Sequence, residues 1–120
     1  MHELSLAESI VDIIHRSVPE DELEEVRIVR MKVGTLSGVV ADSLDFCFSA
    51  ISARTPLAQA RLEIERIPFS VLCNSCRKTF VNDIGYVVCP DCGSIETTVV
   101  SGRELQVTEI ELDNEEEETP

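Results

Sequence analysis

The chain is poor in aromatic side chains: its 120 residues include no tryptophan, one tyrosine and four phenylalanines. Because 43% of the residues are nevertheless hydrophobic, the core must be built mainly from valine, isoleucine and leucine. No apolar run approaches the roughly 20 residues that cross a bilayer, so we expect no membrane partner. The first residues, Met1-His2-Glu3-Leu4, lack the basic stretch that opens a secretion signal.

Positive charge is also scarce. Ten lysines and arginines stand against 23 acidic residues, which gives a formal net charge of −13. A nucleic-acid binder needs cations to neutralise phosphates, so this balance argues against nucleic acid as a partner. Proteins and metal ions are the partners that we expect instead.

The five cysteines are distributed unevenly. Four of them form two C-x₂-C clips twelve residues apart, Cys73 with Cys76 and Cys89 with Cys92. Two such clips can place four thiolates around one ion, and a tetrahedron of thiolates suits Zn²⁺. Two disulfides, a redox pair and an iron site are the alternatives; a redox pair would leave one clip unused. With metal-type clips rather than a disulfide framework, a reducing, cytoplasmic location is expected.

The hydrophobic pattern predicts an α+β fold. Helical periodicity favours helices over residues 4–18 and about 43–53, and strand-like segments cover 26–33, 61–72, 97–100 and 105–112. We expect a small three-stranded sheet with two helices and an inserted Cys₄ zinc-ribbon domain. The predicted boundaries are 1–72 with 98–112 for the α+β domain, 73–97 for the ribbon and 113–120 for a disordered acidic tail.

A histidine at position 2 has a ligand option that no interior histidine has. The α-amine of Met1, the amide nitrogen of His2 and its imidazole can bind one ion through two fused chelate rings, and three coplanar nitrogens suit Ni²⁺ or Cu²⁺. Glu3 would offer an oxygen at a remaining position. The alternative is an ordinary exposed histidine near a frayed chain end.

With this start and the cysteine clips, the chain resembles the HypA/HybF family of hydrogenase nickel-incorporation proteins. The resemblance covers nearly all of residues 1–112. It rests on Met1-His2-Glu3, on the segments Gly34-Thr35-Leu36-Ser37-Gly38-Val39 and Thr55-Pro56-Leu57, and on the four clip cysteines.

The resemblance implies a nickel metallochaperone, Ni(II) at His2 with Met1 and Glu3 beside it, and Zn(II) at Cys73, Cys76, Cys89 and Cys92. It also implies work with a nickel-binding GTPase of the HypB type in loading the large subunit of nickel–iron hydrogenase.

One position departs from the family. Members commonly carry a carboxylate where this chain has Val40, and the nearest acid is Asp42, which we weigh as a nickel ligand or as the N-cap of the second helix. Cys47, on the apolar stripe of that helix, is expected to be a small buried side chain. No catalytic triad, phosphate loop or carboxylate pair is visible, so we expect no enzyme. The rival classes are a zinc-ribbon interaction module without nickel and an iron electron-transfer protein.

Overall fold

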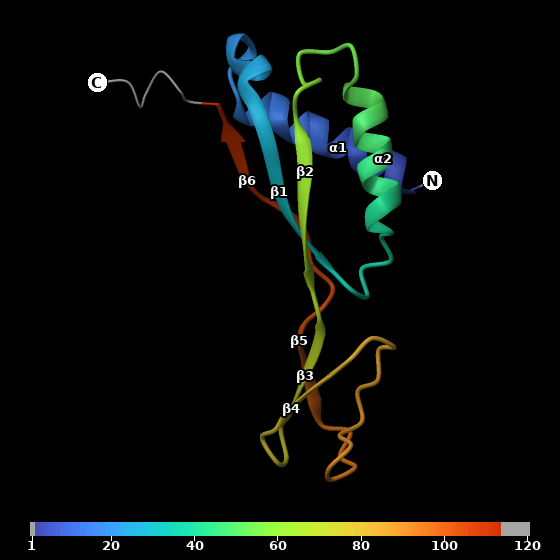
Figure 1. The fold of residues 1–120 in the computed structure, drawn as a ribbon. Coiled ribbons are helices and arrows are strands. Elements are labelled where there is room, and N and C mark those ends of the chain that lie inside the picture. Colours follow the sequence, from blue (N-terminus) through green and yellow to red (C-terminus); the bar gives the residue numbers. More distant parts are fainter. Residues whose placement is uncertain (1, 114–120) are drawn as a thin grey trace, which may run out of the picture. The chain divides into compact units, whose positions relative to one another are not determined.

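The computed structural model describes residues 2–113 and confirms the α+β class (Figure 1). Along the described chain the elements are α1 (His2–Ser17), a 3₁₀ helix (Glu20–Glu25), β1 (Val26–Gly34), α2 (Ala41–Ser52), β2 (Arg61–Ile67), β3 (Phe69–Cys73), β4 (Thr79–Asn82), β5 (Thr97–Ser101) and β6 (Leu105–Leu112). The acidic tail expected over 113–120 falls, but for its first residue, outside the described residues.

The described chain divides into two compact units. Residues Lys32–Val39 and Glu65–Gln106 form unit 2, and the remaining described residues form unit 1. Unit 2 therefore takes in more of the chain than the ribbon segment 73–97. The assignment of nickel binding to one domain and zinc binding to the other stays a prediction.

The predicted three-stranded sheet is present, with strand order β2-β1-β6. Helices α1 and α2 pack against each other and lie on one side of it (Figure 1). The core follows the periodicity of the sequence, since the buried residues recur every three or four positions on the helices and alternate in most of β1. The largest buried side chains of this unit are Ile10, Ile14, Leu23, Met31, Leu44, Phe48 and Leu57.

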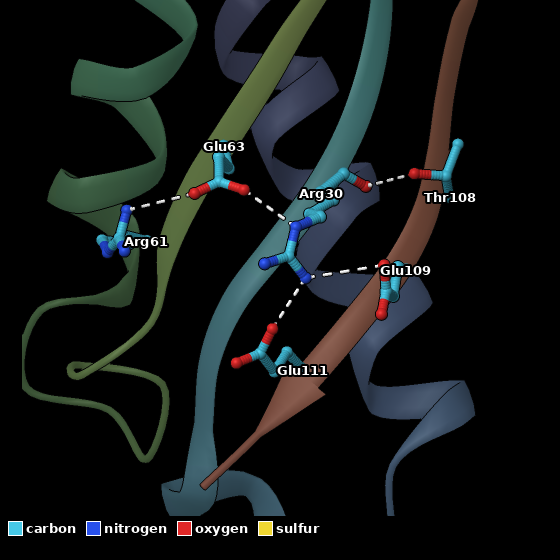
Figure 2. A network of polar contacts seen from close by, with 6 residues as sticks. All are labelled: Arg30, Arg61, Glu63, Thr108, Glu109 and Glu111. Carbon is cyan, nitrogen blue, oxygen red and sulfur yellow. Dashed lines mark hydrogen bonds and ion pairs between the residues drawn. The ribbon is translucent and has the colours of Figure 1, made fainter.

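The opposite face of this sheet is polar (Figure 2). Arg30 at its centre contacts Glu63 of β2 at 2.8 Å and Glu111 and Glu109 of β6 at 2.7 and 3.5 Å. These carboxylates raise the pKa of the Arg30 guanidinium, Glu111 most. The network joins all three strands on a half-exposed face, where each ion pair is weak but their number matters.

The strand predicted over 61–72 is wrong in one respect: it is two strands, separated at Pro68. Proline has no N–H to donate to a ladder, so it marks a place where pairing stops. β2 pairs in the first sheet, and β3 becomes the centre of a second sheet with the order β4-β3-β5. Both pairings of β3 are antiparallel.

Two glycines of unit 2, Gly34 and Gly102, allow close approach of the backbone. A Cβ on Gly34 would lie 2.1 Å from the carbonyl carbon of Gly102, and a Cβ on Gly102 would lie 2.4 Å from the Cα of Phe69. Gly102 also has a φ of +117°, which L side chains rarely adopt. The strands can approach this closely only because both positions lack a side chain.

Candidate metal sites

The two cysteine clips meet in unit 2. Cys73 ends β3, Cys76 follows in the next turn, and Cys89 and Cys92 come from the loop before β5. All four Sγ atoms lie within 4.8 Å of one another. The Sγ atoms of Cys73 and Cys92 are 3.6 Å apart, and those of Cys76 and Cys89 are 3.7 Å apart.

These separations fit a tetrahedral zinc ion. With Zn–S bonds of about 2.3 Å, the edge of a tetrahedron of sulfurs is about 3.8 Å. The separations are too long for a disulfide bond of about 2.05 Å, and the cysteines are free. The donor set and its spacing therefore match the group that the clips predict.

Each clip is closed by the same backbone turn. The N–H of Arg77 donates to the carbonyl of Cys73 at 2.8 Å, and the N–H of Gly93 donates to the carbonyl of Cys89 at 2.9 Å. Both turn residues have positive φ, 70° for Arg77 and 75° for Gly93. Glycine adopts such a conformation readily, whereas arginine rarely does, so only the second clip carries a sequence signal for the turn.

The thiols are not equivalent. The N–H of Cys76 donates to the sulfur of Cys73 at 3.4 Å, and such donors lower the pKa of Cys73 to about 6. For Cys92 the N–H of Ser94 acts in the same direction, but contact with the other sulfurs, that of Cys73 first, outweighs it and raises the pKa to about 12. A bound cation favours the thiolate form of all four cysteines.

An ion pair also joins the two clips. Lys78, just after the first clip, lies 3.2 Å from the carboxylate of Asp91, inside the second. The pair raises the pKa of Lys78. Its effect on stability is small because both side chains are exposed.

The other candidate site lies in unit 1, at the start of α1. The helix begins at His2, two residues before the predicted start at residue 4, and His2 is exposed. The amide of His2 is among the first N–H groups of the helix, which have no partner in the preceding turn. The structure thus leaves both the imidazole and this amide free of helical bonding. Met1 lies outside the described residues.

Glu3 ties this start to α2. Its Oε2 accepts a hydrogen bond of 3.0 Å from the N–H of Val40, the N-cap of α2. This bond lowers the pKa of the Glu3 carboxyl. Asp42 makes no such bond, since α2 has no side-chain N-cap, so the N-cap explanation of Asp42 is wrong. Sequence patterns gave no sign that residues 3 and 40 would meet.

Asp42 is exposed and shares a hollow with Glu3. The hollow has a volume of about 470 Å³ and is lined by Glu3, Asp42, Ser43, Phe46 and Cys47. Cys47 lines this hollow and is half-buried, so the expectation of a small buried side chain is wrong. Among the described residues these groups are not gathered into a ligand cluster like that of the four cysteines.

The fold and the cysteine centre define a class: a small α+β protein that carries a four-thiol metal site on its own compact unit. The family described as "Hydrogenase/urease nickel incorporation, metallochaperone, hypA" matches residues 1–112. The chain belongs to this HypA family. The resemblance seen in the sequence is thereby confirmed.

Two relatives are similar to this chain in sequence, and a solved structure is similar to it in fold. The chain is 42% identical over 113 residues to the hydrogenase maturation factor HypA of Rhodopseudomonas palustris strain BisA53, covering 94% of this chain and all of that one. It is 40% identical over 116 residues to HypA of Roseiflexus sp. strain RS-1, covering 96% and 94%. The solution structure of the nickel metallochaperone HypA from Helicobacter pylori has the same fold, with a TM-score of 0.61, 20% identity and coverage of 92% and 96%.

Proposed function

We propose that this chain captures Ni(II) at its N-terminus and delivers it into the active site of nickel–iron hydrogenase. The observation that carries the proposal is the family match over residues 1–112, which includes Met1-His2-Glu3. The exposed position of His2 and the unbonded start of α1 support it, since an incoming ion can reach both without opening the fold.

In this proposal the amine of Met1, the amide nitrogen of His2 and its imidazole hold the ion. Glu3 completes the site: while Oε2 remains on the N–H of Val40, its other oxygen is available to the metal. Asp42, on the rim of the same hollow, is a further oxygen donor for a later step of binding or release. Few contacts hold such a terminal site, so the ligands of a recipient can replace them one by one.

The four cysteines are proposed to hold Zn(II) with a structural role. Closed Cys₄ tetrahedra leave no position for a substrate, and they stabilise units too small to fold on apolar burial alone. Residues 73–97 would then form the zinc domain, with 1–72 and 98–112 forming the nickel domain. The chain acts as a carrier and not as an enzyme.

The proposed partners are a nickel-binding GTPase of the HypB type and the hydrogenase large subunit, in the cytoplasm. No helix among residues 2–113 has the length and apolar character needed to cross a membrane. The family's part in hydrogenase maturation supports the choice of both partners.

The test compares the two histidines of the chain. His2 and His15 both lie exposed on α1. In cells that depend on this chain, His2→Ala should abolish hydrogenase activity and nickel in the large subunit, while zinc content and helical signal stay normal. His15→Ala should leave all four unchanged.

Normal hydrogenase maturation by the His2→Ala variant would reject the nickel proposal. A chain that binds zinc but no nickel would instead be an interaction module built on the zinc unit.

A further inference from the structure

Unit 2 exposes apolar side chains around β4. Val81 on this strand is 62% exposed, and Ile84 and Tyr86 in the loop that follows are 78% and 50% exposed. Single exposed apolar residues are ordinary on protein surfaces. Three within six residues, on one strand end and its loop, form a patch that we call the β4 patch (Val81, Ile84 and Tyr86).

The loop that presents the patch is held in shape by one side chain. The Oδ1 of Asn82 accepts hydrogen bonds from the N–H groups of Ile84 and Tyr86, at 3.0 and 2.9 Å, and its Nδ2 donates to the carbonyl of Tyr86 at 2.9 Å. Gly85 makes the turn with a φ of +82°. Ile84 is therefore held out toward solvent by a preorganised loop, and preorganisation lowers the entropy lost on binding.

The strand beside the loop is open to a further strand. Within residues 2–113, β4 lies at the edge of the order β4-β3-β5 and pairs with β3 alone. None of its residues, Thr79 to Asn82, carries a charge, although edge strands are commonly protected by one. A hollow of about 300 Å³ lies at its end, lined by Thr35, Pro68, Phe69, Val81, Asn82 and Asp83, all of unit 2.

The charge of the chain indicates which kind of segment can pair with the edge of β4. Unit 2 holds as many acidic as basic residues, so it does not repel a cation or an anion locally. The whole chain carries −13, which draws in positively charged partners and opposes a second copy of itself. Asp83 stands exposed between the strand and Ile84, where it can pair with a lysine or arginine.

We propose that β4 and the β4 patch form a docking site for an extended, basic segment of a partner protein. The segment pairs with the free edge of β4 and places an apolar side chain in the hollow beside Pro68. Ile84 contacts the partner's surface next to that strand. The site is distinct from the proposed nickel site and from the four cysteines, but β4 and its loop lie between the two clips, so it requires the ribbon to be folded.

The first experiment identifies the occupant. A photo-reactive phenylalanine analogue replaces Ile84 in the full-length, zinc-loaded chain inside its own cells, and the cross-linked peptide is sequenced by mass spectrometry. The matched control carries the same analogue at Ile95, which is also in unit 2 and is 77% exposed. The expected product joins position 84 to a segment of net positive charge with alternating apolar residues.

The second experiment uses the purified partner with four lysine variants of equal charge change. Ile84→Lys and Val81→Lys should each weaken binding at least about tenfold, since a buried interface anchor is lost and a cation meets a basic segment. The controls are Ile95→Lys and Val100→Lys, the latter on the other edge strand, β5, and 59% exposed. Both controls should bind like the native chain.

Protection of the β4 amides from hydrogen exchange in the complex should accompany binding. A product formed with an acidic peptide or with a second copy of the chain would overturn the proposal. So would the absence of any product at position 84, or equal weakening in the β4 and control variants. Nickel and zinc titrations of the same variants should be unchanged, so the nickel proposal is decided separately.

Discussion

Phe48→Ala should be the most costly single change in α2, and its neighbour Phe46 provides the control. Phe48 is 0% exposed on a helix that packs against α1, whereas Phe46, two residues earlier, is 74% exposed. A phenylalanine buries about 150–250 Å², which at about 25 cal/mol/Å² is about 4–6 kcal/mol. Alanine retains part of this, and the cavity adds a cost, so the free energy of unfolding should fall by about 3–5 kcal/mol.

Phe46→Ala should change that free energy by less than about 0.5 kcal/mol. Urea unfolding of the zinc-loaded chain, followed by far-UV circular dichroism, measures both values. Because the cysteines lie in unit 2, zinc content should be normal in both variants. Similar losses for Phe46→Ala and Phe48→Ala would refute the packing described for α1 and α2.

Three further predictions concern the metal sites. Cys73→Ala should abolish zinc binding and unfold the ribbon while the helical signal remains, as measured by zinc analysis and circular dichroism; a zinc-loaded variant would contradict the four-thiol site. Cys47→Ala should cost about 1 kcal/mol or less and leave both metal stoichiometries unchanged, because this thiol is only half-buried; lost nickel binding would make it a ligand. The bond from the N–H of Val40 lowers the pKa of Glu3, so it stabilises the fold above the ordinary pKa of a glutamate and is lost as pH falls through the lowered value. In an NMR titration the Val40 amide shift should follow that acid-range pKa and should stop titrating in Glu3→Gln; an unchanged Val40 titration would disprove the contact.

The sequence predicted the elements that depend on local periodicity. The buried positions of α1, such as Ile10 and Ile14, repeat at helical spacing. The spacing of the two cysteine clips predicts that their four sulfurs meet. Both could be read without a structure because each is set by neighbours within a few residues.

What the sequence could not supply depends on contacts between distant residues. The strand β4 was missed because its four residues show a pattern too short to separate from a loop. The break at Pro68 separates two sheets, and only the pairing partners of β2 and β3 reveal it. The bond from Val40 to Glu3 spans 37 positions, and Asp42, which was weighed as a nickel ligand or as the N-cap, does not cap α2. When the N–H at the start of one helix bonds to a side chain of another helix, the sequence near that start gives no sign of the bond.

The most direct test of the central claim is a nickel titration of the untagged, zinc-loaded chain with and without one added residue before Met1. The addition leaves His2 and Glu3 in place but converts the terminal amine of Met1 into a peptide nitrogen, which destroys the fused chelate. Calorimetry should show one tight nickel site in the native chain and a much weaker one in the extended chain, with zinc content equal in both. Equal nickel affinity in the two chains would contradict a site built on the N-terminal amine.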